Sequence, residues 1–150
     1  MEILYTRYRI FTNIQSRSMF LRKSSVVVHG VIVAFGAPIF ELTGRTFAFS
    51  SLFSAMALMP PAIHLGFNKE TWFRVFLDLK ARNLDELTIR LTTLSSLLGA
   101  WLGAIPIPLD WDEPWQAWPV TLTYGAMFGA FVSSTTLFLL SRLDVFDLKL

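Results

Sequence analysis

The chain contains no cysteine, and few of its residues are charged. Without cysteine the protein has no disulfide, no thiolate metal site and no cysteine nucleophile. Only 16% of its 150 residues are Asp, Glu, Lys or Arg, whereas 53% are hydrophobic, which exceeds the share usual for soluble domains. The net charge is +2, but the basic residues are split among the predicted loops. They form no continuous stripe, so the sequence argues against nucleic-acid binding.

Charged residues are absent from four long stretches of the chain, residues 24–40, 46–68, 91–109 and 114–141. Three of these reach or exceed the length of about 18 residues that marks a candidate transmembrane helix. A soluble four-helix bundle is the alternative, but it would carry charged residues at helical spacing within the stretches. The sequence therefore predicts an all-α, multi-pass membrane protein. We expect four transmembrane helices, at about 24–41, 47–67, 88–106 and 119–140.

Segments rich in basic residues alternate with segments that have few, from one end of the predicted membrane domain to the other. The N-terminal arm and the middle loop each carry five basic residues, the first turn has only Arg45, and the loop 107–118 has none. Because positively charged loops stay in the cytosol, both termini are expected there. The arm has no continuous apolar core, so no cleaved signal peptide is expected. The predicted division is a basic cytosolic arm (1–23), a polytopic membrane domain (24–140) and a cytosolic tail (141–150).

The middle loop is apolar enough to lie on the membrane surface. Asn68 is placed to cap a short helix, and the residues after it include six apolar side chains: Trp72, Phe73, Val75, Phe76, Leu77 and Leu79. We expect a cytosolic interfacial helix here, with an ordinary solvated loop as the alternative. Asn83, with Glu86 three residues later, is a capping pair, so the third predicted span should begin as a helix near Leu84.

Small residues recur four apart in the third and fourth predicted spans. Gly99 and Gly103 share one helical face, and so do Gly125 and Gly129. Small residues at this spacing let two helices approach closely in lipid. The simpler interpretation is that the two spans pack on each other, and the alternative is that they bind the helix of another protein.

The stretch between these spans, GAWLGAIPIPLDWDEPWQAWP at 99–119, combines proline, tryptophan and acidic residues. Pro106 and Pro108 should end the helix and hold the chain extended and stiff. The tryptophans are expected at the headgroup level, and their density predicts a surface that another molecule covers. The residues assigned to partner contact in this loop are Pro106, Pro108, Asp110, Trp111, Asp112, Trp115 and Trp118.

Chemistry-bearing side chains are sparse. Asp110, Asp112 and Glu113 could offer oxygen ligands to Mg²⁺ or Ca²⁺, but a solvated acidic turn is the favoured interpretation, and no metal or other cofactor is predicted. His29 and His64 fall within predicted spans, where a histidine hydrogen-bonded to a neighbouring helix is more common than a catalytic one. No phosphate-binding loop, zinc-binding H-E-x-x-H or nucleophile-elbow motif is present. The predicted outer turns are also too short to hold a catalytic domain.

With these residues in view, the chain resembles the Pig-F family of glycosylphosphatidylinositol (GPI) anchor assembly proteins of the endoplasmic reticulum. The resemblance is carried by the stretch 99–119 and by FGAPIFEL at Phe35–Leu42. Weaker similarity runs through Trp72–Phe76 and Thr92–Leu98, so that about residues 27–140 are covered. Family members usually have further spans before this region and often have a basic residue where Glu113 stands.

The resemblance implies a non-catalytic membrane subunit. It would bind and stabilise the ethanolamine phosphate transferases that add phosphoethanolamine to the mannoses of the GPI precursor, and the partner would hold the active site. Two other functions stay open from the residues alone. One is a lipid transporter or scramblase subunit of the endoplasmic reticulum. The other is a small intramembrane lipid phosphotransferase that uses Asp110 and Asp112.

Overall fold

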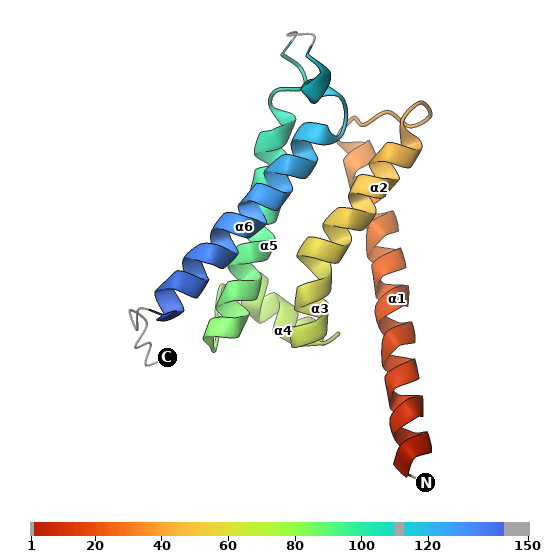
Figure 1. The fold of residues 1–150 in the computed structure, drawn as a ribbon, viewed down its shortest axis with the longest axis vertical. Helices are drawn as coiled ribbons and strands as arrows, with labels where there is room; N and C mark the ends of the chain where they lie inside the picture. Colours follow the sequence, from red (N-terminus) through yellow and green to blue (C-terminus); the bar gives the residue numbers. More distant parts are fainter. Residues whose placement is uncertain (1, 110–112, 143–150) are drawn as a thin grey trace. The chain divides into compact units, whose positions relative to one another are not determined.

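The computed structural model describes residues 2–109 and 113–142, and in this part of the chain every regular element is a helix. The all-α prediction is therefore confirmed for the described residues. The chain divides into two compact units, Met1–Ala55 and Met56–Leu150. The boundary falls inside the helical stretch Thr43–Leu65, which contains α2, a short π-helical segment η1 and α3 (Figure 1).

The first unit is a hairpin of two helices, α1 (Glu2–Ala34) and α2 (Thr43–Phe53), which pack on each other. Among the described side chains of α1 and α2, four small polar residues are buried: Ser24, Ser25, Thr46 and Ser50. Each hydroxyl donates to a carbonyl three or four residues earlier in its own chain segment, as Ser50 Oγ does to Thr46 O at 2.7 Å. Small side chains whose hydroxyls are satisfied in this way can be buried without an unpaired polar group.

The predicted end of the first span was wrong. It was expected to run to residue 41, but α1 ends at Ala34. Gly36 follows with a φ of +101°, a conformation open to glycine because it has no Cβ. Pro38 then cannot donate a backbone hydrogen bond. The chain between Phe35 and Leu42 is consequently a turn and an irregular segment.

In the second unit, the helix that ends at Leu65 contains two consecutive prolines. A side chain from another helix replaces the hydrogen bond that the second of them removes. Here α3 (Met59–Leu65) follows the π-helical segment η1 (Ser54–Leu58). Because Pro61 has no N–H, the carbonyl of Ala57 loses its helical partner. The hydroxyl of Thr93, in α5, donates to this carbonyl at 2.8 Å. The distortion at η1 is thus tied to a proline and a compensating side chain.

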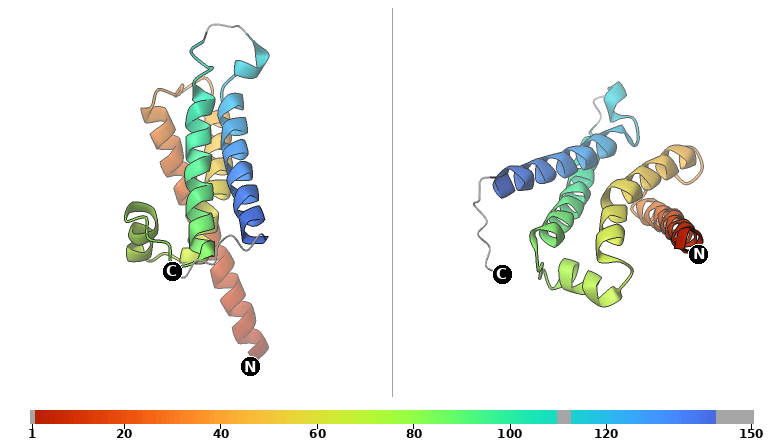
Figure 2. Two further views of the ribbon diagram at one scale, coloured as in Figure 1. Left: turned by 90° about the vertical axis from the view of Figure 1, so that its left-hand side faces the viewer. Right: turned by 60° about the horizontal axis from the view of Figure 1, so that its bottom comes forward.

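The rest of the second unit is a pair of long antiparallel helices with a short bent segment at one end and a loop at the other (Figures 1 and 2). The pair is α5 (Leu84–Ala104) and α6 (Val120–Arg142). Before it come α4 (Lys69–Trp72) and the π-helical η2 (Phe73–Leu77), and between the two helices lies the 3₁₀ turn η3 (Pro114–Gln116). Asn68 and Asn83 accept hydrogen bonds from the N–H groups of Glu70 and Glu86, so both predicted caps are confirmed, and α5 begins at Leu84 as expected.

Two helical stretches of the described chain are long and apolar enough to cross a membrane, Thr43–Leu65 and Val120–Arg142. They match the second and fourth predicted spans, whereas the first and third do not meet the same criterion. α5 is 21 residues long, but Asp85, Glu86 and Arg90 occupy its first two turns and shorten its apolar part below the usual span of about 20 residues. The structure thus supports two candidate spans in place of four.

Candidate functional site

Two glycines, Gly99 and Gly125, face each other where α5 and α6 approach closely. A Cβ built on Gly99 would overlap the carbonyl oxygen of Gly125 and lie 2.8 Å from its carbonyl carbon. The reverse also holds, since a Cβ on Gly125 would overlap the oxygen of Gly99 and lie 2.9 Å from its carbonyl carbon. The backbones are therefore in direct contact, which only residues without a side chain allow.

The same contact repeats one helical turn to each side. A Cβ on Gly103 would overlap the carbonyl oxygen of Thr121, and one on Gly129 would overlap that of Ser95. All four glycines singled out from the sequence thus lie between α5 and α6. Ser96, Ala100, Leu122 and Ala126 are buried beside them. The structure brings the two small-residue faces together within the chain rather than leaving either one open to another protein.

Hydroxyl groups line the same pair of helices toward the start of α5 and the end of α6. Ser96 is fully buried and its hydroxyl donates to Thr92 O at 2.8 Å within α5. The hydroxyls of Thr92 and Ser134 lie 3.3 Å apart, across the two helices. Hydrogen bonds of this kind between helices in lipid contribute about 1 kcal/mol each, so this contact adds modestly to the glycine contacts.

α6 presents a different surface on its other side. Tyr124, Phe128, Phe131 and Phe138 follow each other at spacings of four, three and seven residues, so they share one side of the helix. Each is between 57% and 70% exposed. Only 11% of the most apolar 18-residue stretch of α6 is buried. A side this apolar needs a lipid or protein neighbour.

At the far end of the pair, the loop turns tightly rather than running extended. α5 ends at Ala104, before Pro106, as predicted. The prediction of an extended Ile105–Leu109 segment was wrong, because the N–H groups of Ile107 and Leu109 donate to the carbonyls of Ala104 and Pro106, both at 3.2 Å. Proline removes a donor but leaves its carbonyl free to accept, and here that carbonyl closes a turn.

One side chain that the sequence did not single out holds this loop together. The amide nitrogen of Gln116 donates to the carbonyl of Pro106 at 2.7 Å and to that of Leu109. Its amide oxygen accepts from the N–H of Glu113 at 3.0 Å. Gln116 thus joins the two limbs of the loop through three backbone atoms. A glutamine two residues after a proline that opens a helical turn was the signal available in the sequence.

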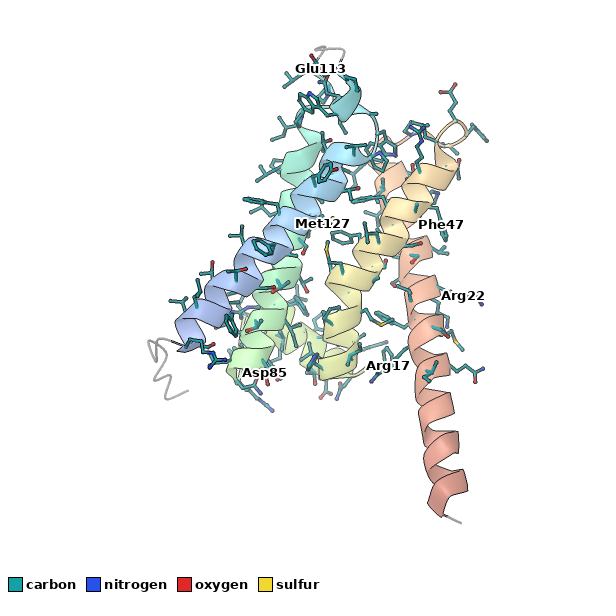
Figure 3. The ribbon with its side chains drawn as sticks, in the orientation of Figure 1. Arg17, Arg22, Phe47, Asp85, Glu113 and Met127 are labelled. Carbon is teal, nitrogen blue, oxygen red and sulfur yellow. The ribbon has the colours of Figure 1, made fainter. Side chains whose placement is uncertain are left out.

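The tryptophans of the loop region are distributed along its surface. Trp101, on α5, is 65% exposed, and Trp115, in η3, is 44% exposed. Trp118 precedes Pro119 through a cis peptide bond. Three residues assigned to partner contact, Asp110, Trp111 and Asp112, lie outside the described residues. Glu113 and Asp85 mark the two opposite ends of the α5–α6 pair (Figure 3).

At the end marked by Asp85, an ion pair joins the middle loop to α5. Arg74, in η2, donates from both terminal nitrogens to the two carboxylate oxygens of Glu86, each at 2.8 Å. Glu86 also accepts from the N–H of Arg82 at 2.8 Å. These bonds stabilise the ionised carboxylate, the Arg74 contact most strongly, and hold the pKa of Glu86 at about 2 against an ordinary 4.5. This pair too was not singled out in the sequence.

The two histidines lie in separate surroundings. His29 packs its ring edge-on against Phe47 within the first unit, with the ring centroids 5.8 Å apart, and its Nδ1 is buried without a hydrogen-bond partner. His64 is exposed on α3. Across residues 2–109 and 113–142, no three His, Asp or Glu side chains gather closely enough to hold a metal ion.

The described residues are all-helical and hold two membrane-span candidates, a glycine contact between α5 and α6, and a loop braced by Gln116. Comparison with known proteins identifies the family. The profile of the GPI biosynthesis protein family Pig-F matches residues 5–137, and the chain belongs to this family. No solved structure is significantly similar to the chain.

Three relatives show how far the similarity extends. The human "GPI ethanolamine phosphate transferase, stabilizing subunit" is 46% identical over 101 residues, which are 67% of this chain and 46% of the human protein. The mouse protein of the same name is 44% identical, over 71% of this chain and 48% of its own. A Schizosaccharomyces pombe "PIGF/3-ketodihydrosphingosine reductase fusion protein" is 43% identical, over 70% of this chain and 21% of its own. The chain spans about half the length of the human and mouse relatives.

Proposed function

We propose that this chain is a non-catalytic membrane subunit that binds and stabilises an ethanolamine phosphate transferase acting on the mannoses of the GPI-anchor precursor. The names of the human and mouse relatives, at 46% and 44% identity, support this function. The partner would hold the active site. The chain would contribute a rigid helix pair and a braced loop.

The observation that carries the proposal is the contrast between the two sides of α6. One side is closed by the glycine contact with α5. The other carries four exposed aromatic residues, a surface suited to the membrane helices of a partner. The loop braced by Gln116 would meet the partner outside the bilayer, through Trp115, Trp118 and the neighbouring Asp110, Trp111 and Asp112.

The proposal includes a membrane topology finer than the two candidate spans. α5 and the second half of α1, although their apolar parts are shorter, would also cross the membrane of the endoplasmic reticulum with their charged ends at its surface, giving four spans. The basic segment between Leu65 and Leu84 would then lie in the cytosol with both termini, because positively charged loops are retained there. The loop with Glu113 would lie in the lumen. Single cysteines placed at Asp85 and Glu113 of this cysteine-free chain would react with an impermeant thiol reagent from opposite sides.

Purification from detergent tests the proposed function. The tagged chain, isolated gently from cells, should carry an ethanolamine phosphate transferase in stoichiometric amount. The isolated chain without its partner should transfer no phosphoethanolamine. A preparation free of any transferase would overturn the proposal, and so would transferase activity of the chain alone.

Two double variants test whether the exposed aromatic residues of α6 bind the transferase. Phe128→Ala and Phe131→Ala together remove exposed aromatic side chains without entering the α5 contact. We expect them to lower the amount of transferase recovered about tenfold, because aromatic side chains dominate such interfaces. Val132→Ala and Leu139→Ala, also exposed on α6, serve as controls for general loss of apolar area. Equal recovery with both pairs would contradict a role for the aromatic stripe.

A further inference from the structure

The segment of α4 and η2 is apolar on its outer side as well as on the side that packs on the protein. Val75 is fully buried, and η2 contacts α5. Phe73 and Leu77 are 59% and 66% exposed. They stand four residues apart, on the opposite side of the same helical turn from Val75. Large apolar side chains exposed on the side away from the packed one need an apolar neighbour there too.

Leu79, just after η2, is held in a conformation that a leucine adopts only under constraint. Its φ is +57°, in the left-handed region that favours glycine. The bonds that impose it are present: Lys80 N donates to Arg74 O at 3.0 Å, and Arg74 Nη1 donates to Lys80 O at 2.8 Å. Strain of this kind persists where the surrounding structure imposes it and often serves a function. Here it keeps a large apolar side chain 59% exposed.

The position of the segment in the chain indicates what covers this outer side. It begins directly after Thr43–Leu65, one of the two helices long and apolar enough to cross a membrane. Gly66, with a φ of +69°, ends that helix, and the indole N–H of Trp72 donates back to Gly66 O at 2.8 Å. The segment is therefore tied to the end of a candidate span. Figure 2 shows it beside the first turns of α5.

Exposed basic residues stand before and after these apolar side chains in the sequence. Lys69 lies at the start of α4, and Lys80 and Arg82 follow Leu79; all three are exposed. Long basic side chains can reach phosphate groups while their stems stay along apolar surface. Exposed carboxylates at Glu70 and Asp78 stand in the same segment, so its exposed surface combines apolar and charged side chains. This combination is typical of structures that lie in a membrane interface.

We infer that Phe73, Leu77 and Leu79 form a wedge that inserts into the phospholipid surface at the end of the Thr43–Leu65 helix, with Lys69, Lys80 and Arg82 at the level of the phosphates. Arg74 and Glu86 position the wedge by fixing it to the start of α5. This inference rests on the membrane placement in the proposed function, but it does not require the transferase. The wedge anchors one end of the chain to one leaflet.

The absence of native cysteine allows a direct test on the full chain in phospholipid nanodiscs. Single cysteines at Phe73, Leu77 and Leu79 would carry a nitroxide label, with Glu70 and Asp78 as control sites in the same segment. Electron paramagnetic resonance then compares collisions with oxygen, which concentrates in the bilayer, and with a water-soluble nickel chelate. We expect the three wedge labels to favour oxygen and the two control labels to favour the chelate.

The possible outcomes distinguish a failure of the wedge inference from a failure of the proposed function. If the labels at Phe73 and Leu77 meet the chelate as often as those at Glu70 and Asp78, the wedge is overturned, whether or not the chain binds a transferase. If the wedge labels lie in lipid but no transferase co-purifies, only the proposed function fails. Labels shielded from both oxygen and chelate would show a protein contact in place of lipid and would also overturn the inference.

A substitution at Leu79 tests its role without unfolding the segment. Leu79→Gly relaxes the backbone, so the melting temperature of the detergent-solubilised chain should not fall. The label at Leu77 should nevertheless become about fivefold more accessible to the chelate, because one apolar side chain no longer enters the lipid. Leu79→Met, which keeps an apolar side chain of similar size, should preserve the depth. An unchanged Leu77 depth in Leu79→Gly would contradict the role assigned to Leu79.

Discussion

Gly99 and Gly125 occupy each other's side-chain space: each glycine has its carbonyl oxygen where a Cβ on the other would stand. The relationship is reciprocal, so neither helix can move a side chain aside to relieve a clash. The obstructing atoms are backbone. A substitution at either position must separate α5 from α6 or distort one of them.

The first prediction concerns this contact. Gly125→Ala should lower the free energy of unfolding of the detergent-solubilised protein by about 1–3 kcal/mol, the usual cost of forcing a methyl group into a closed contact. Thermal unfolding followed by circular dichroism measures it. Gly30→Ala is the control, since a Cβ at Gly30 meets nothing within 4 Å and alanine favours the helix by up to about 1 kcal/mol. Equal melting temperatures for the two variants would refute the contact.

The second prediction concerns the loop brace. Gln116→Glu retains an oxygen that can accept from Glu113 N–H but loses the amide donors to the carbonyls of Pro106 and Leu109. The loop should open more often, and amide hydrogen exchange at Glu113 and its neighbours should accelerate about tenfold, as expected for the loss of one or two hydrogen bonds of about 1 kcal/mol each. Exchange within α6 beyond Tyr124 is the internal control. Unchanged exchange in the loop would show that Gln116 does not brace it.

The third prediction is a pH dependence. The pKa of Glu86 is held at about 2 by Arg74 and by the N–H of Arg82, against 4.5 in the unfolded chain. The unfolded state therefore binds this proton first as the pH falls. The stabilisation is fully present above about pH 4.5 and is lost as the pH falls towards 2.

Glu86→Gln tests this dependence. The variant should be less stable than the parent at pH 6, and the difference should shrink between pH 4.5 and 2, as measured by the midpoint of thermal unfolding in detergent. Asp85→Asn, one residue away and exposed, is the control for removing a carboxylate from the first turn of α5. A constant difference between Glu86→Gln and the parent at all pH values would argue against the ion pair as its source.

The fourth prediction concerns the proline pair. Thr93→Val keeps the size of the side chain but leaves the carbonyl of Ala57 without the hydroxyl that lies 2.8 Å away. Losing a partner for a buried carbonyl costs about 1–3 kcal/mol, so the variant should unfold at a lower temperature. Thr93→Ser keeps the hydroxyl and should lie closer to the parent. A Thr93→Val protein as stable as Thr93→Ser would contradict the compensation.

Local signals in the sequence predicted part of the fold well. Asn68 and Asn83 begin the helices that they were expected to cap, because capping depends on a few neighbouring backbone groups. The end of α5 before Pro106 was predicted for a similar reason, since proline removes a donor. The end of α1 was missed, because apolar residues continue to Phe40 while Gly36 and Pro38 already break the helix.

Other features depend on partners distant in the sequence and could not be predicted from spacing alone. Gln116 meets Pro106 and Leu109 only once the loop has turned, and Arg74 meets Glu86 only once η2 has folded back to the start of α5. The glycine pattern named the residues of the α5–α6 contact, but it left open whether the other helix belonged to this chain.

The abundance of the transferase in cells tests the central claim most directly. Cells depleted of this protein would be complemented with the parent chain, with Gly103→Leu, or with Gly30→Leu as a control in open space, each expressed to the same level. The account predicts a transferase level restored by the parent and by Gly30→Leu and several-fold lower with Gly103→Leu, because the α5–α6 pair cannot close. A transferase level that is the same with and without this protein would contradict the account.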